Sequence, residues 1–232
     1  MMDKMKKILV VVAHPDDDIL GCGGTLSKLI KSGKDIKVVI LGEGSTCRFL
    51  KEKTSSVKAK KTINQRKQFE TEALKILGVS EFIFYNLPCG RFDTIPIIDI
   101  GKLVENEINT FNPDTIFTHF EKDTNNDHRL VFQAVLQATR PGAQNIVDNV
   151  LSFEILSSTE WRFTERFKPN YFVNIKFEIK DKINAFSKFT TEQKPFPFPR
   201  SSEGIEILSK YRGMQVAVQN AEAFLIVRSI EK

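Results

Sequence analysis

One stretch, residues 7–25 (KILVVVAHPDDDILGCGGT), constrains the fold of this chain more than any other. An apolar and mostly β-branched run over residues 8–12 breaks at Ala13-His14-Pro15, and an amphipathic run opens after three aspartates. This pattern predicts a buried strand that passes directly into a helix. The helix macrodipole favours carboxylates at a helix start by roughly 0.3–1 kcal/mol each, but it does not explain the histidine beside them. The break is therefore a candidate for half of a metal site.

Strand and helix patterns alternate along most of the chain. Residues 35–41 predict a second strand after the first helix, which is expected over 17–32, so the sheet is expected to be parallel. Further strands are predicted at 82–85, 115–119, 149–156, 171–175 and 223–227, and further helices at 64–77, 98–111, from 127 to a stop at Pro141, 180–189 and 200–218. The sequence therefore predicts an α/β, Rossmann-like fold with a mostly parallel sheet flanked by helices, in a single domain over 1–232.

Composition and charge exclude several classes of protein. The net charge of +5 is carried partly by the lysine-rich segment 51–67, which lacks interleaved aromatics and any nucleic-acid-binding spacing. We expect this segment to be a solvated loop running into a helix, without a nucleic-acid partner. The first apolar run is too short for a secretion signal, and no stretch approaches the roughly 20 apolar residues of a membrane span. Three scattered cysteines without a CxxC pair favour a cytoplasmic location over a disulfide framework or a thiolate zinc site.

The three histidines of the chain, His14, His119 and His128, are each predicted at a strand end or a helix start. In a parallel sheet these positions share the edge formed by the carboxyl ends of the strands, where ligands bind. Catalytic zinc takes three protein ligands and keeps one open position, and His14, Asp17 and His128 can supply them. Zn²⁺ or another divalent ion is the expected cofactor, with Asp16 free to act as general base toward a metal-bound water. The alternative is a helix start whose acids are satisfied by the macrodipole without an ion.

The segments AHPDDDILGCGG and NNDHRLV resemble the LmbE-like (PIG-L) family of zinc-dependent N-deacetylases, whose signature is HPDD followed later by DH at a helix start. LPCGRFDT, SFEILSSTEW, FPRS and YRGMQVAVQNAEAF resemble stretches of one bacterial subgroup, so the resemblance covers nearly the whole chain. The resemblance implies a Rossmann-like fold and hydrolysis of an N-acyl group, usually acetyl, from an amino sugar or its conjugate. By motif position, it implies that His14, Asp17 and His128 are the metal ligands and that Asp16 is the base.

Some positions depart from the family pattern. Many members have a histidine three residues before the second metal histidine, where it is thought to stabilise the oxyanion, and this chain has Asn125. An asparagine amide can donate to an oxyanion but cannot act as a general acid near neutral pH. Protonated Asp16 is then the expected donor to the leaving amine, unless His119 reaches the site. Cys89-Gly90 stands where the subgroup often has Asp-Asn, and Phe198 where it often has histidine.

Other polar residues are candidates for substrate contacts. Arg48 follows the second predicted strand, where it could hold an anionic or polyhydroxylated ligand or simply lie on the surface. Trp161 could stack on a sugar ring or belong to the core. Asp127, beside the second metal histidine, could cap the helix or orient a metal ligand. The remaining candidates are Arg91, Arg200 and His119.

The residues and the resemblance together predict a deacetylase that acts on an N-acylated amino sugar, free or linked to a nucleotide. The alternative is a non-catalytic carbohydrate- or metal-binding protein on the same fold, which the absence of a histidine at Asn125 favours. A nucleotide-binding Rossmann domain is excluded, because Gly21-Cys22-Gly23-Gly24 falls inside the first predicted helix and not in the turn that would hold a pyrophosphate. A homo-oligomer is compatible with this sequence.

Overall fold

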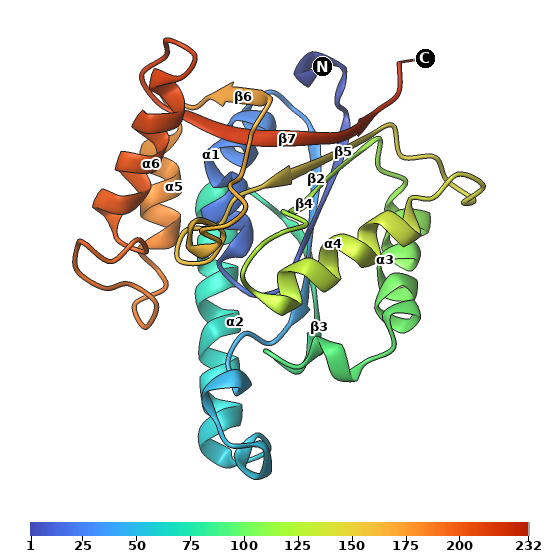
Figure 1. The fold of residues 1–232 in the computed structure, drawn as a ribbon, viewed down its shortest axis with the longest axis vertical. Helices are drawn as coiled ribbons and strands as arrows, with labels where there is room; N and C mark the ends of the chain where they lie inside the picture. Colours follow the sequence, from blue (N-terminus) through green and yellow to red (C-terminus); the bar gives the residue numbers. More distant parts are fainter. Residues whose placement is uncertain (232) are drawn as a thin grey trace.

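A seven-stranded mixed sheet forms the centre of the computed structural model, which describes residues 1–231 (Figure 1). The strand order is β3-β2-β1-β4-β5-β7-β6. Strands β1 to β5 are parallel to their neighbours among themselves, and β7 is antiparallel to β5 and β6. The bounds are β1 (Lys7–Val12), β2 (Asp35–Gly42), β3 (Glu81–Leu87), β4 (Thr115–His119), β5 (Asn149–Phe153), β6 (Tyr171–Asn174) and β7 (Ala221–Ser229). The predicted α/β fold with a mostly parallel sheet is confirmed.

Helices cover both faces of the sheet. Helices α1, α2, α5 and α6 lie on one face, and α3 and α4 lie on the other (Figure 1). Their bounds are α1 (Asp17–Lys31), α2 (Val57–Leu77), α3 (Ile97–Phe111), α4 (Asn126–Ala138), α5 (Ile179–Phe186) and α6 (Ser202–Met214). Short 3₁₀ helices are η1 (Met2–Lys4), η2 (Thr46–Arg48), η3 (Lys51–Lys53), η4 (Phe92–Thr94) and η5 (Thr159–Trp161). Among residues 1–231, none of the helices combines the length and the apolar character needed to span a membrane.

Strand β1 is apolar throughout because both of its faces are covered. Ile8, Val10 and Val12 belong to the core that the sheet forms with α1, α2 and α5. Leu9 and Val11 belong to the second core, which the sheet forms with α3 and α4. Successive side chains of a strand point to opposite faces, so a central parallel strand needs apolar residues at every position. The same property explains why the first apolar run shows no alternation with polar residues.

The sheet topology brings two of the three histidines to one place. β1 lies between β2 and β4, where the strand order changes direction. Ligands of open α/β sheets bind outside the carboxyl ends of the strands at such a switch point. His14 follows β1 directly and His119 is the last residue of β4. The prediction that these histidines share the carboxyl-end edge of the sheet therefore agrees with the strand order.

Some predicted boundaries are wrong for reasons that the structure shows. Helix α2 begins at Val57 and not at 64, because the Ser56 side chain accepts a hydrogen bond from the N–H of Ala59 and caps it. Much of the lysine-rich segment is therefore the start of a helix and not a loop. The last helix ends at Met214 rather than 218, and Ala217 then takes a positive φ of 57° before β7. The fifth strand stops at 153, short of the predicted 156.

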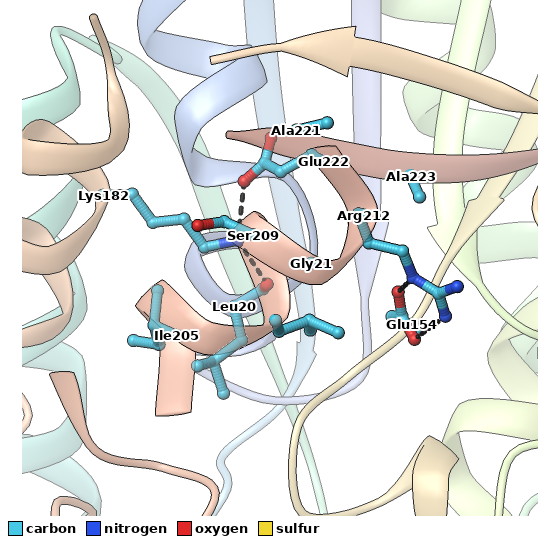
Figure 2. A pocket seen from close by; sticks show the side chains of 11 residues that line it. Leu20, Gly21, Glu154, Lys182, Ile205, Ser209, Arg212, Ala221, Glu222 and Ala223 are labelled. Carbon is cyan, nitrogen blue, oxygen red and sulfur yellow. Dashed lines mark hydrogen bonds and ion pairs between the residues drawn. The ribbon is translucent and has the colours of Figure 1, made fainter. Parts of the chain in front are cut away.

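Helix α1 has a break at Cys22, where φ is −145° and ψ is 15°. A break leaves backbone groups without their helical partners, and these groups must be satisfied by other means. The N–H groups of residues 24–25 donate to the Glu222 carboxylate at 2.9 and 2.6 Å. Lys182 Nζ donates both to the carbonyl of Leu20 (2.7 Å) and to Glu222 (2.6 Å), as Figure 2 shows. The buried ion pair of Lys182 and Glu222 thus supplies hydrogen-bond partners to backbone groups on both sides of the break.

We expect Lys182→Met to lower the free energy of unfolding by about 3–5 kcal/mol, because it leaves the buried Glu222 without its cation. The matched control is Lys31→Met, which removes a largely exposed lysine from its pair with Asp181 and should cost less than about 1 kcal/mol. Urea denaturation followed by circular dichroism measures both. Equal losses in the two variants would show that the ion pair at the break of α1 has no special role.

Candidate metal centre

The chain turns sharply between β1 and α1, and this turn builds the site. Asp16 has a left-handed backbone conformation, with φ 91° and ψ −20°, which costs a non-glycine residue on the order of 1–3 kcal/mol. Its N–H donates to Glu70 Oε2 (2.8 Å), and its carbonyl accepts the N–H of Leu20 (2.9 Å). These two bonds hold the turn in place. They carry the chain from His14 at the strand end to Asp17 at the helix start.

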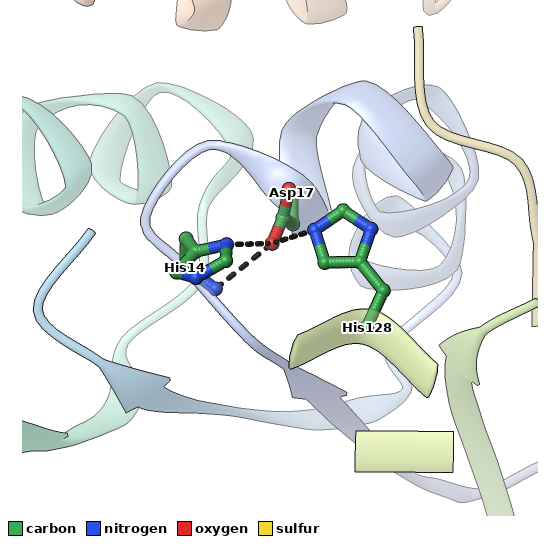
Figure 3. A group of neighbouring side chains, drawn as sticks. All are labelled: His14, Asp17 and His128. Carbon is green, nitrogen blue, oxygen red and sulfur yellow. Dashed lines mark hydrogen bonds and ion pairs between the residues drawn. The ribbon is translucent and has the colours of Figure 1, made fainter. Parts of the chain in front are cut away.

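Three side chains converge after this turn. The Oδ2 atom of Asp17 lies 3.4 Å from Nδ1 of His14 and 3.3 Å from Nε2 of His128. Figure 3 shows this oxygen between the two imidazole rings. All three residues are buried, and His14 is the most exposed of them at 7%. One donor atom from each lies within 4.8 Å of the other two, so together they could hold a metal ion.

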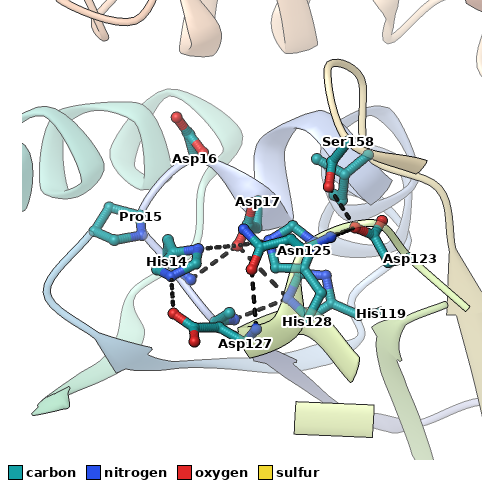
Figure 4. Close-up of polar contacts among 12 residues, drawn as sticks. His14, Pro15, Asp16, Asp17, His119, Asp123, Asn125, Asp127, His128 and Ser158 are labelled. Atoms are coloured by element: carbon teal, nitrogen blue, oxygen red, sulfur yellow. Dashed lines mark hydrogen bonds and ion pairs between the residues drawn. The ribbon is translucent and has the colours of Figure 1, made fainter. Parts of the chain in front are cut away.

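The second nitrogen of each imidazole meets another carboxylate (Figure 4). Nε2 of His14 lies 2.9 Å from Oδ2 of Asp127, and Nδ1 of His128 lies 3.3 Å from Oδ1 of Asp123. Carboxylates placed in this way orient metal-binding histidines and set which nitrogen carries the proton. Each ring could therefore keep its proton on the side of Asp127 or Asp123, which would leave the nitrogen beside Asp17 free to bind an ion.

The outer carboxylates are themselves held by the loops around the site. Asp127 accepts the N–H of Gly90 through Oδ2 (2.5 Å) and the N–H of Phe92 through Oδ1 (3.2 Å). Asp123 accepts hydrogen bonds from the hydroxyl groups of Ser158 and Thr159. Segments after β3 and β5 thus fix the two carboxylates, which in turn fix the two imidazoles.

The carboxylates make both imidazoles strong bases. Burial alone would lower the pKa of His14, but hydrogen bonds to Asp127 and Asp17 raise this pKa to about 9. Burial also opposes a charged His128, yet the charge of Asp17 and the contact with Asp123 raise its pKa to about 10. Burial would raise the pKa of Asp17, but the two neighbouring histidines hold it well below its usual range. Such a concentration of buried negative charge requires positive charge beside it.

The residues present fit a divalent metal ion. Oδ1 of Asp17 is buried without a hydrogen-bond partner in residues 1–231, and neither ring nitrogen of His128 makes a well-directed hydrogen bond there. Two imidazoles and one carboxylate are a donor set of the kind that zinc takes in catalytic sites. A second group, His14, Cys89 and Asp127, has donor atoms equally close. We favour the first group. In the second group the Asp127 carboxylate already accepts hydrogen bonds from His14 and from the backbone N–H of Gly90.

Asp16 lies beside this group and not within it. Figure 4 shows its side chain directed away from His14 and Asp17. Its Oδ2 contacts the guanidinium groups of Arg66 (3.2 Å) and Arg200 (3.0 Å). Burial raises the pKa of Asp16 in spite of these two cations. Its Oδ1 is buried without a hydrogen-bond partner in the described part of the chain, so one carboxylate oxygen has no protein donor.

The cations around Asp16 belong to a wider network centred on Glu192. Arg66 contacts Oε1 of Glu192 at 2.5 Å, and Arg48 binds both carboxylate oxygens at 2.9 and 2.7 Å. Arg48 was predicted as a ligand contact, but in the structure its guanidinium is paired with Glu192. Its side chain is still half exposed, at 48%. Arg200 extends from the same network, with Nε donating to the carbonyl of Leu156 (3.3 Å).

Arg91 and Trp161, two further predicted substrate contacts, differ in how far their side chains are engaged by the protein. The guanidinium of Arg91 donates to the carbonyls of Thr46, Phe49 and Cys89, each at 3.2 Å, so it ties two loops together instead of standing free. Trp161 is 45% exposed and meets the Phe198 ring edge-on at 6.4 Å, so it is not a core residue. An exposed tryptophan keeps a face available for a sugar ring.

His119 lies beneath the site. Its Nε2 accepts the N–H of Ala13 (2.8 Å), and its ring stacks on His128 with the centroids 3.9 Å apart. Burial, together with the charge of His128, lowers the pKa of His119 well below its usual value, so the ring is neutral with its proton on Nδ1. His119 is buried, and it contacts the backbone of Ala13 and the ring of His128, which it supports from one face.

Asn125 is the cap of helix α4. Its side-chain oxygen accepts the N–H of Asp127 at 2.9 Å. Capping, which was one of two predicted roles for Asp127, therefore belongs to Asn125. Asp127 takes the other role, as the carboxylate that orients His14. With its oxygen committed to the cap, Asn125 can offer only the donor side of its amide to a ligand.

Several residues of the site were not predicted. Arg66 and Glu70 lie on the same face of α2 as the buried Ala73 and Leu77. Charged residues at positions that the helical periodicity assigns to the buried face indicate a buried polar site, and the sequence contained this signal. Asp123, Ser158 and Glu192 come from loops and Thr159 begins η5, and their sequence context offers no comparable signal.

The chain matches known deacetylases over much of its length. The family model described as PIG-L, GlcNAc-PI de-N-acetylase, matches residues 9–139, which is more than half of the chain. A diacetylchitobiose deacetylase of Thermococcus kodakarensis is 28% identical over 200 residues, covering 83% of this chain and 71% of the relative.

Solved structures share the fold. N,N'-diacetylchitobiose deacetylase from Pyrococcus horikoshii, in complex with an inhibitor, has a TM-score of 0.77 and 20% identity, covering 98% of this chain and 85% of its own. GalB, the 4-carboxy-2-hydroxymuconate hydratase from Pseudomonas putida KT2440, also has a TM-score of 0.77, with 21% identity and coverages of 98% and 99%. At such identities the likeness establishes the fold alone, because one fold hosts different reactions.

We expect Asp127→Ala to lower the affinity for Zn²⁺ by about 10–100-fold, because it removes the carboxylate that orients His14. Competition with a chromophoric zinc chelator measures the affinity. Asp93→Ala, which removes an exposed carboxylate from the neighbouring 3₁₀ helix η4, is the matched control and should bind as the wild type does. Equal affinities of the Asp127 and Asp93 variants would contradict the role of Asp127.

The network around Glu192 should make stability depend on pH. Burial would raise the pKa of Glu192, but Arg48 and Arg66 lower it from 4.5 to about 2. A carboxyl group with a lowered folded-state pKa stabilises the fold above its unfolded-state pKa, and this contribution is lost as the pH falls through the folded-state value.

We therefore expect Glu192→Gln to be less stable than the wild type at about pH 7, with a gap that narrows as the pH falls from 4.5 toward 2. Free energies of unfolding from urea titrations at several pH values measure the gap. The exposed Glu52→Gln serves as control and should show no gap at any pH. A gap for Glu192→Gln that stays constant across this range would contradict the lowered pKa.

Proposed function

Because the chain belongs to the PIG-L (GlcNAc-PI de-N-acetylase) family, we propose that it is a metal-dependent deacetylase that hydrolyses the N-acetyl group of an amino sugar or sugar conjugate. The observation that carries this proposal is the convergence of His14, Asp17 and His128 with a second carboxylate, Asp16, beside them. Zn²⁺ is the proposed ion, and another divalent ion could take its place because imidazole and carboxylate ligands accept several metals.

The proposed chemistry divides the work among the residues of the turn. His14, Asp17 and His128 would hold the ion, which would supply Lewis acidity toward a water and the substrate carbonyl. Asp16 accepts the proton of the attacking water through Oδ1, the oxygen that has no hydrogen-bond donor among the described residues. Burial supports this role, because a raised pKa makes the carboxylate a better base near neutral pH.

The same carboxyl group then completes the reaction. Protonated Asp16 donates its proton to the leaving amine, since no histidine stands at Asn125 to act as general acid. Arg66 and Arg200 hold Asp16 in one orientation through both steps. The Asn125 amide is the proposed donor to the oxyanion of the tetrahedral intermediate. It is positioned by its own cap bond at the start of α4.

The proposed substrate is an N-acetylglucosamine-containing sugar. The relative in Thermococcus kodakarensis is a diacetylchitobiose deacetylase, which supports a sugar of this type. Trp161 is exposed enough to stack on a sugar ring, and Arg200 reaches Asp16 and is a candidate contact to a sugar hydroxyl. A nucleotide-linked sugar is a second form in which the same group could be presented.

A second candidate is a non-catalytic protein that binds a sugar or a metal on the same fold. The observation in its favour is Asn125, which cannot transfer a proton as a histidine would. The two candidates differ in turnover. Acetate release from diacetylchitobiose, N-acetylglucosamine and UDP-N-acetylglucosamine by the zinc-loaded protein supports the deacetylase, and binding without release supports the second candidate. A chelator should abolish the release, and added Zn²⁺ should restore it.

We expect Asp16→Asn to lower kcat by about 10²–10⁴-fold while the bound zinc per chain stays unchanged. Asparagine tolerates the positive φ of this position, so the turn should keep its shape. Acetate release and metal analysis on the same sample measure the two quantities. An Asp16→Asn protein with full activity would rule out Asp16 as the base, and a parallel loss of zinc would show that Asp16 acts on the metal site itself.

A further inference from the structure

Two cysteines that are far apart in the sequence face each other beside the candidate metal centre. Cys47 lies in η2 after β2, and Cys89 lies in the loop after β3. Their sulfur atoms are 3.1 Å apart, with the Cys89 thiol donating to Cys47. Cys22, the remaining cysteine, is buried in α1. Cys47 and Cys89 meet in space although they are distant in the sequence, because the neighbouring parallel strands β2 and β3 bring their following loops together.

The surroundings of the two thiols differ in a way that suits stepwise oxidation. Cys47 is exposed, whereas Cys89 is 5% exposed. The hydrogen bond from Cys89 lowers the pKa of Cys47 to about 6, with His14 and Arg48 contributing positive charge. The same hydrogen bond and burial raise the pKa of Cys89. An accessible thiolate next to a protonated thiol is the arrangement of a reactive cysteine and its resolving partner.

We propose that Cys47 and Cys89 form a reversible dithiol–disulfide site that is closed by peroxides and reopened by thiol reductants. The Cys47 thiolate attacks one oxygen of hydrogen peroxide, which breaks the O–O bond, releases water after protonation and leaves a sulfenic acid. Cys89 sulfur then attacks the Cys47 sulfur, the S–S bond forms as the S–O bond of the sulfenic acid breaks, and the Cys89 proton leaves with the hydroxyl group as a second water. Two thiols are oxidised and one peroxide is reduced. The sulfur atoms must approach from 3.1 Å to about 2.05 Å.

Formation of the Cys47–Cys89 disulfide should disturb the candidate metal centre. The N–H of Cys89 donates to Glu43 Oε1 (2.8 Å), and the N–H of Gly90 donates to Oδ2 of Asp127. That same Asp127 oxygen meets Nε2 of His14. A movement of the Cys89 loop toward Cys47 therefore disturbs a contact that orients His14. This consequence rests on the proposed metal centre, whereas formation of the disulfide does not.

The test begins with the fully reduced, metal-free, full-length chain treated with one equivalent of hydrogen peroxide. We expect the free thiols, counted after denaturation, to fall from three to one, and peptide mapping to find Cys47 joined to Cys89. Dithiothreitol should restore all three. Cys47→Ser and Cys89→Ser should form no intramolecular crosslink, whereas Cys22→Ser should crosslink as the wild type does. Three remaining thiols, or oxidation of Cys47 without a crosslink, would overturn the proposal.

The consequence is tested by zinc affinity. The oxidised wild type should bind Zn²⁺ at least about tenfold more weakly than the reduced form, whereas peroxide should leave the affinity of Cys47→Ser unchanged. A crosslink without a change in affinity would refute the coupling to His14 and leave the disulfide site standing. Absence of zinc binding in both forms would refute the proposed metal centre, and the thiol count would still decide the redox site.

Discussion

The Asp17 carboxylate is the centre on which the rest of the site depends. It is fully buried at the start of α1, and a buried charge is tolerated only with close partners. Its partners are the imidazoles of His14 and His128 and the backbone N–H of His14, which donates to Oδ2 at 2.8 Å. Each imidazole in turn needs an anion on its far side. Oδ2 of Asp17 is thus surrounded by two imidazoles, and each imidazole is followed by a further carboxylate, Asp127 or Asp123.

A similar alternation surrounds the neighbouring carboxylate. Asp16 is held by Arg66 and Arg200, and Glu192 neutralises Arg66 in turn. Positive charge lowers the energy of the Asp16 anion, and burial raises it. A general base requires this kind of balance, because full neutralisation would leave too weak a base and isolation would leave it protonated. The two adjacent aspartates of one turn therefore have different environments and different proposed roles.

The helix that carries both aspartates is itself supported at a distance from the site. The break at Cys22 is closed by Lys182 and Glu222, which come from α5 and β7. The last third of the chain thus fixes the position of the first helix. The fold is shared with a deacetylase and with a hydratase, so the reaction must come from the side chains that the fold presents. Family membership and the donor group point to the same chemistry here.

The sequence by itself determined the order of strands and helices and the residues at the heart of the proposed site. Hydrophobic periodicity is a local property. The change from strand to helix between His14 and Asp17 can therefore be predicted from consecutive residues. A helix start beside His128 was equally local. The uncertain parts were ends of helices, where a single cap such as Ser56 decides the boundary.

Only the tertiary structure decided which groups face one another. Arg200 reaches Asp16 from 184 positions away, and Cys89 meets Cys47 across 42. Contacts of this kind depend on strand register and on the path of the loops, which local propensity does not specify. The cap of α4 is local, since Asn125 accepts the N–H of Asp127, whereas the partner of the Asp127 carboxylate, His14, comes from 113 positions away. The sequence predicted the proposed ligands His14, Asp17 and His128, whereas the packing of distant segments determines which groups surround them.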